Sequence, residues 1–152
     1  MLSEYLDIIM TDEIREKLGG VYSIGANVAV SPVPKGELIM QVSFACDPGR
    51  VQELSDAVLF QLKQVADNII DPGNFAKAVE ALKKEWEISM QSNSHIAQSF
   101  TNSSVLLNLP LSRLYNRPKD YDAVTMADIR QICARLMQSD NNGPVKVVLL
   151  PE

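Results

Sequence analysis

The chain has 152 residues, a net charge of −5, 46% hydrophobic residues and 22% charged residues. This length and composition are typical of one globular domain with a sizeable core, and they exclude wholesale disorder. Acidic and basic residues alternate without a basic stripe, which argues against nucleic acid as a partner, and no apolar run reaches the roughly 18 residues of a membrane span. We therefore expect residues 1–152 to form a single domain.

The N-terminal segment predicts a helix, a sharp corner and a strand. Apolar side chains recur at helical spacing from Leu2 to Leu18, and Gly19 and Gly20 supply the left-handed backbone that often ends a helix. Residues 21–30 then alternate with a period near two. This arrangement places Arg15 on the last turns of the helix and Tyr22 at the start of the strand, so that two long hydrogen-bond donors can converge.

A structural interpretation of both residues stands beside the functional one. Arg15 is a cation near a helix C-terminus, where its charge is favourable in any protein. Tyr22 is an aromatic residue in a strand, where such residues commonly fill the core. The pattern alone favours this structural interpretation, because glycine commonly follows the last residue of a helix in proteins of any function.

A hairpin and a helix are predicted next. Prolines and Gly36 break the first strand, and residues 38–46 alternate again, which indicates an antiparallel hairpin with a long connection. Asp47-Pro48 is a typical helix start. The apolar face of that helix is expected to consist of Val51, Leu54, Val58, Leu62, Val65 and Ile69.

The middle of the chain predicts further helices. Asp71-Pro72 starts one whose apolar stripe runs from Phe75 to Met90 and includes Trp86, which we interpret as a core residue. Residues 88–112 contain no formal charge but many Ser, Asn and Gln side chains. We expect one face of this segment to pack on the sheet and its polar face to meet another domain or line a cavity. His95 lies here without partners at metal-binding spacing, so we interpret it as a surface or structural residue.

The last third predicts a polar loop, a helix and a closing strand. Residues 115–120 are polar and include Pro118, which favours a loop. Thr125-x-x-Asp128 resembles a capping box that opens a helix with five inward positions: Ile129, Ile132, Cys133, Leu136 and Met137. A turn at 141–144 precedes an apolar strand at 145–150, which should pair centrally in the sheet or beside the hairpin.

The predicted order of elements indicates an α+β fold. It is a two-layer sandwich in which helices pack on an antiparallel or mixed sheet, with only three visible strands and an exposed sheet edge. Cys46 and Cys133 are far apart in sequence and are interpreted as buried small hydrophobic residues rather than a disulfide or metal pair.

The chain resembles the C-terminal homologous, non-zinc domain of the pitrilysin/insulinase family of zinc peptidases, in a bacterial member. Members carry an Arg and a Tyr separated by six residues across a Leu-Gly pair, and Arg15, Leu18, Gly19 and Tyr22 occupy those positions here. The segment Tyr121–Ile129, with the helix and apolar strand that follow, resembles the way such domains close. The resemblance implies that Arg15 and Tyr22 bind the substrate backbone near a zinc ion held in another domain.

The inverted zinc motif H-x-x-E-H of that family is absent, because His95 is the single histidine of the chain. We therefore expect no catalytic residue and no bound metal in this chain, which by itself should be inactive, while the resemblance implies a zinc metallopeptidase as its parent. The resemblance implies a fragment of a longer multidomain peptidase whose zinc lies elsewhere. Its expected partners are a peptide substrate, the N-terminal zinc-bearing domain or a partner subunit, and a second copy through the exposed edge.

The alternative function is a noncatalytic scaffold or interaction subunit of the same superfamily. A free-standing binding domain unrelated to proteolysis is a weaker third interpretation. A bacterial member would be expected in the periplasm or cell envelope, with the cytoplasm as second choice.

Overall fold

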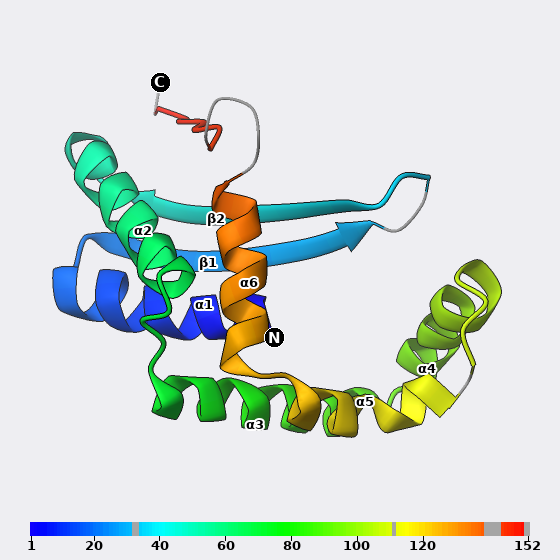
Figure 1. Ribbon diagram of the computed structural model, residues 1–152. Helices are drawn as coiled ribbons and strands as arrows, with labels where there is room; N and C mark the ends of the chain where they lie inside the picture. Colours follow the sequence, from blue (N-terminus) through cyan, green and yellow to red (C-terminus); the bar gives the residue numbers. More distant parts are fainter. Residues whose placement is uncertain (32–33, 111, 139–143, 151–152) are drawn as a thin grey trace.

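The computed structural model describes residues 1–31, 34–110, 112–138 and 144–150 as one α+β unit (Figure 1). Helices pack on an antiparallel sheet, as the sequence predicts, but the sheet in these residues has two strands instead of three. The elements are α1 (Leu2–Met10), the π-helix η1 (Thr11–Leu18), β1 (Val21–Ser31), β2 (Glu37–Cys46), the 3₁₀ turn η2 (Pro48–Arg50), α2 (Val51–Ala66), α3 (Pro72–Ser89), α4 (Asn93–Phe100), the π-helix η3 (Thr101–Leu106), α5 (Ser112–Ala123) and α6 (Met126–Met137).

The hairpin carries one irregularity. Its register runs from Ser31 opposite Glu37 down to Ser23 opposite Ala45, and then shifts so that Val21 lies opposite Cys46. Tyr22 is therefore the extra residue of a β-bulge. Bulges bend the strand and re-aim a side chain, and they are frequent beside active sites.

Helix α1 covers the free edge of β1 with two side chains. The backbone N–H of Ala26 donates to the Asp7 carboxylate at 2.6 Å, and the N–H of Val28 donates to the Ser3 hydroxyl at 2.7 Å. These side chains satisfy edge groups that a neighbouring strand would otherwise bond. The first helix thus both packs on the hairpin and closes one of its edges.

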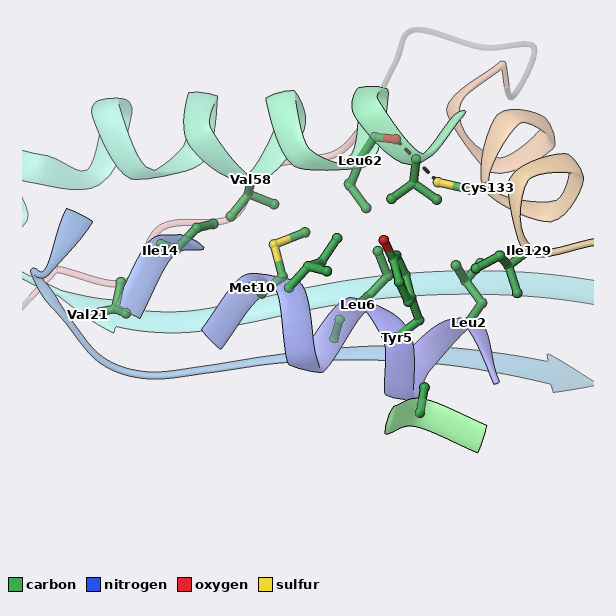
Figure 2. Close-up of a cluster of buried hydrophobic side chains, with 14 of the residues drawn as sticks. Leu2, Tyr5, Leu6, Met10, Ile14, Val21, Val58, Leu62, Ile129 and Cys133 are labelled. Atoms are coloured by element: carbon green, nitrogen blue, oxygen red, sulfur yellow. Dashed lines mark hydrogen bonds between the residues drawn. The ribbon is translucent and has the colours of Figure 1, made fainter. Parts of the chain in front are cut away.

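The core lies between α1, the inner face of the hairpin, α2 and α6 (Figure 2). The side chains that are almost fully excluded from solvent are Tyr5, Leu6, Met10, Ile14, Leu54, Val65, Ile129 and Cys133. Tyr5 also accepts a hydrogen bond on its hydroxyl from the backbone N–H of Asp71 at 3.1 Å. This bond ties the start of α3 to the core.

Both predicted helix starts are confirmed by their capping bonds. Asp47 accepts from the backbone N–H of Gly49 at 2.7 Å, and Asp71 accepts from that of Asn74 at 2.7 Å. Thr125 and Asp128 form a reciprocal capping box at the start of α6. The hydroxyl and backbone N–H of Thr125 donate to the Asp128 carboxylate, which lowers the pKa of that group.

The predicted apolar faces of α2 and α6 are correct in their centres, and each is wrong at one position. Ile69 lies beyond the end of α2 and is 60% exposed, because Asn68 takes a left-handed conformation with φ of 70° and turns the chain away. Ile132 is 37% exposed on α6, whereas Ile129 and Cys133 are buried.

The predicted polar loop at 115–120 is wrong, because these residues belong to helix α5 with Pro118 inside it. Proline has no backbone N–H, so the carbonyl of Leu114 loses its helical partner four residues later. The indole N–H of Trp86 donates to that carbonyl at 3.2 Å instead. Helix α3 thus supplies the hydrogen-bond donor that allows α5 to continue through the proline. Trp86, predicted as a core residue, is half-buried between these two helices and lies outside the main core.

Replacing Trp86 with Phe should therefore lower the free energy of unfolding by about 1–2 kcal/mol, because the Leu114 carbonyl would lose its partner. Urea unfolding followed by far-UV circular dichroism measures the change. Tyr115→Phe on the exposed side of α5 is the matched control and should leave stability within about 0.5 kcal/mol. Equal stability of Trp86→Phe and wild type would contradict this role.

The predicted closing strand at 145–150 is also wrong. Residues 144–150 form no strand, and Val145 and Leu149 are 90% and 91% exposed. The Lys146 ammonium group donates a hydrogen bond of 3.0 Å to the side chain of Gln52 at the start of α2. This segment therefore contacts the helix and is not part of the hairpin ladder. Most of the predicted turn, 141–143, lies outside the described residues.

The two cysteines are free, as predicted, but only Cys133 is fully buried. Its thiol donates to the Leu62 carbonyl at 3.4 Å (Figure 2), and burial raises its pKa to about 11. Because the thiolate is the reactive form, a thiol reagent at about pH 8 should label partly exposed Cys46 first. Mass spectrometry of the labelled peptides, with a urea-unfolded sample as reference, measures this order. Faster labelling of Cys133 would contradict the burial described here.

Candidate functional site at the double-glycine corner

The corner between η1 and β1 depends on two glycines with positive φ. Gly19 has φ of 57° and Gly20 has φ of 111°, conformations that L-amino acids with a side chain rarely adopt. A Cβ atom on residue 20 would overlap Nη1 of Arg50. The backbone conformation favours glycine at position 20, and a larger residue there would also push the flexible Arg50 side chain aside.

Arg50, four residues after the end of β2, stabilises this corner with a hydrogen bond. Its guanidinium donates to the Gly19 carbonyl, which joins η2 to a residue 31 positions earlier. The same group makes two hydrogen bonds to the Glu53 carboxylate, at 2.7 and 3.0 Å. The bonds from Arg50 lower the pKa of Glu53, which keeps the pair charged.

Tyr22 lies beside Arg50 and points out of the core. Its side chain is 84% exposed, and its hydroxyl makes no hydrogen bond to any described residue. A shallow hollow at this point is lined by Gly20, Val21, Tyr22, Asp47 and Arg50. The interpretation of Tyr22 as a core-filling strand residue is therefore wrong, and the bulge explains how the alternation of the strand is broken.

Arg15 is exposed on η1, and its closest carboxylate is that of Glu16 at 3.8 Å. It is not among the residues that line the hollow beside Tyr22. The sequence prediction assumed α-helical spacing up to Leu18, whereas residues 11–18 form a π-helix, which changes the direction of each side chain. The structure thus brings Tyr22 and Arg50 to one hollow, with Arg15 on the preceding helix.

Sequence reasoning missed Arg50. The segment Asp47-Pro48-Gly49-Arg50 indicated a helix start, and the spacing of Arg50 and Glu53 is typical of an ion pair within one helical turn. Neither signal reveals that the guanidinium reaches back to Gly19. Only the folding of the hairpin brings the two segments together.

The charge-free segment 88–112 lies elsewhere. The prediction that one of its faces packs on the sheet is wrong, because the helices in close contact with the hairpin are α1, η1 and α6. In Figure 1, α4 lies beyond the end of α3 and away from the hairpin ladder. Its polar side chains line a second hollow with α3 and α5. His95 is exposed there, with Nε2 at 3.2 Å from the Ser99 hydroxyl.

The residues present do not fit a zinc ion. Across the described parts of the chain, no group of three or more His, Cys, Asp or Glu side chains is arranged to hold a metal ion. A catalytic zinc site uses three protein ligands and one open position. No helix in the described ranges is long and apolar enough to cross a membrane.

The sequence profile of the family described as "Peptidase M16 inactive domain" matches residues 1–82, which include the corner, the hairpin and α2. The chain belongs to this family. The matched range also contains Arg15, Tyr22 and Arg50. A comparison with curated proteins found no match.

Two solved bacterial proteases share the fold. The periplasmic protease PqqL from Escherichia coli has a TM-score of 0.66 and 18% identity, over 88% of this chain and 14% of PqqL. A protease from Helicobacter pylori has a TM-score of 0.65 and 13% identity, over 87% of this chain and 34% of that protease. The chain therefore spans a minor part of the length of each.

Proposed function

We propose that this chain is the substrate-binding domain of a zinc metalloendopeptidase whose zinc lies in another domain or subunit. The observation that carries the proposal is the position of Tyr22: a bulge residue, 84% exposed, whose phenol makes no hydrogen bond to the described residues beside the double-glycine corner. Membership in a peptidase family described as an inactive domain supports a binding role rather than a catalytic one.

The chemistry of the two predicted residues suits this role. A phenol donates one hydrogen bond to a carbonyl oxygen or to a developing oxyanion, and such preorganised donors stabilise the transition state of peptide hydrolysis. The planar fork of Arg15 presents several donors to a peptide backbone. Neither side chain needs to transfer a proton, so the general base and the metal belong to the partner domain.

The test is Tyr22→Phe in the full-length peptidase, which removes one hydroxyl and keeps the ring. We expect kcat to fall by about 10²-fold with a peptide substrate, since one lost oxyanion donor has an effect of that order. Tyr115→Phe, on exposed helix α5, is the control and should leave kcat unchanged. Unchanged kinetics for Tyr22→Phe would remove Tyr22 from the mechanism.

The alternative proposal is a noncatalytic scaffold of the same family, which the description "inactive domain" favours. Under this alternative, an assembly containing the chain would bind peptide without cleaving it, and Tyr22→Phe would alter affinity alone. Titration of a peptide against the assembly, with product analysis, separates the two proposals.

The proposed partners follow from the open side of the sheet. Ala26 and Val28 direct their N–H groups toward α1, so their partners on β2, Val42 and Met40, direct their backbone groups away from β1. No strand occupies that edge in the described residues. We propose that the N-terminal zinc-bearing domain or a second copy of this chain covers it. For location we propose the periplasm, where the Escherichia coli neighbour is found.

A further inference from the structure

A second hollow, of about 330 Å³, lies between α3, the α4–η3 segment and α5, away from the double-glycine corner. Its size is at the lower end of the range for small-molecule sites. One part of its lining is apolar or aromatic and consists of Leu82, Trp86 and Tyr121. Hydroxyl and amide groups come from Ser99, Asn102 and Ser103. The polar groups come from the charge-free segment, whose composition neither a core helix nor an ordinary surface helix explains.

Charges of both signs line this hollow. Arg113 has Asp120 as a distant partner at 3.9 Å. Glu85 on α3 and Arg117 on α5 form no hydrogen bond or ion pair with any described residue, although both line the hollow. Helices α3 and α5 pack against each other. Glu85 lies near the Glu4 carboxylate and Arg117 near the N-terminal amine of Met1, so each has a neighbour of like charge and no ion pair among the described residues. An exposed carboxylate and an exposed guanidinium thus line the same small space from two adjoining helices.

The wall formed by η3 has the irregular backbone that is frequent at binding sites. Residues Thr101–Leu106 form a π-helix, and Asn108 follows with a positive φ of 50°. The hydroxyl of Ser104 in this turn is buried without a hydrogen-bond partner among the described residues. Opposite η3, the indole of Trp86 is fixed by its bond to the Leu114 carbonyl. The hollow thus has a wall of irregular backbone facing an indole held by a hydrogen bond.

We propose that this hollow binds a zwitterionic ligand the size of an amino acid or dipeptide with an apolar side chain. Arg117 pairs with the ligand carboxylate, Glu85 pairs with its ammonium group, and Trp86 contacts its apolar side chain. A ligand with a single charge would leave one of the two protein charges unpaired. The proposal does not depend on the proposed peptidase role, because binding is measured without any catalytic partner.

Trp86 is the single tryptophan of the chain, so its fluorescence reports on this hollow alone. The chain is titrated with the dipeptide Leu-Phe, with free phenylalanine, and with N-acetyl-Leu-Phe-amide, which lacks both charges. We expect saturable fluorescence changes with one or both zwitterions and at least about tenfold weaker binding of the blocked dipeptide. The stronger of the two zwitterions identifies the source as peptide or free amino acid. Calorimetry confirms each dissociation constant.

Arg117→Gln and Glu85→Gln each remove one proposed contact and should weaken zwitterion binding about tenfold. Arg130→Gln on α6 and Glu87→Gln on the exposed side of α3 are the matched controls and should bind as wild type does. Absence of saturation with both zwitterions, equal binding of the blocked dipeptide, or unchanged binding by both hollow variants would overturn the proposal. The first two outcomes use only the wild-type chain, so they do not depend on the folding of any variant.

Discussion

Gly20→Ala should lower the free energy of unfolding by about 3 kcal/mol. A left-handed backbone with φ of 111° costs an alanine roughly 1–3 kcal/mol. The new Cβ atom would also overlap the Arg50 guanidinium, which must move aside and loses its bond to the Gly19 carbonyl. Loss of that hydrogen bond adds about 1 kcal/mol. Chemical unfolding followed by circular dichroism measures the total.

Two other glycines separate the causes of this effect. Gly36→Ala has no Cβ contact within 4 Å and no positive φ, so it should be nearly neutral. Gly19→Ala has a positive φ of 57° but also no contact within 4 Å, so it isolates backbone strain from the clash with Arg50. If Gly20→Ala and Gly36→Ala unfold at the same denaturant concentration, the corner does not need its glycine.

Leu6→Ala should cost about 3–5 kcal/mol, the largest effect of any single change considered for this chain. Leu6 has no exposed surface and lies at the centre of α1, where the hairpin and the other helices meet (Figure 2). The substitution removes apolar contacts and leaves a cavity that rigid neighbours cannot fill. Equilibrium unfolding in urea measures the loss. Leu18→Ala, at a side chain 47% exposed, is the control and should cost less than about 1 kcal/mol.

Local signals predicted much of the fold. Helical spacing, two Asp-Pro starts and a Thr-x-x-Asp capping box are short-range features, and the structure confirms the helices that they predict. The alternation in residues 21–30 and 38–46 predicted the hairpin in the same way. These signals succeed because each depends on residues within a few positions of one another.

The failures depend on distant partners. Pro118 continues a helix because Trp86, 28 positions before Leu114, supplies a donor to the orphaned carbonyl. The apolar segment 145–150 forms no strand although the outer edge of β2 is open among the described residues, and its Lys146 contacts Gln52 on α2 instead, 94 positions earlier. A pattern that spans a few neighbouring residues cannot reveal either of these long-range contacts.

The candidate site was partly predictable. The glycine pair and the family resemblance directed attention to Arg15 and Tyr22, and the positive φ angles of both glycines are confirmed. Two features were not predicted: the bulge that exposes Tyr22, and the hydrogen bond from Arg50 to the Gly19 carbonyl. A bulge shifts a register by one residue, and a periodic pattern of short strands does not resolve such a shift. The joint role of Arg15 and Tyr22 in substrate binding stays a prediction.

The side chains of Asp7 and Ser3 along β1 also limit how this chain can assemble with itself. If two copies join through their sheets, the contact must be β2 against β2, which a two-fold axis satisfies with antiparallel strands. The resulting four-stranded sheet would end at α1 on both sides. Such an assembly is closed at two copies, since a filament would need a second open edge on each molecule.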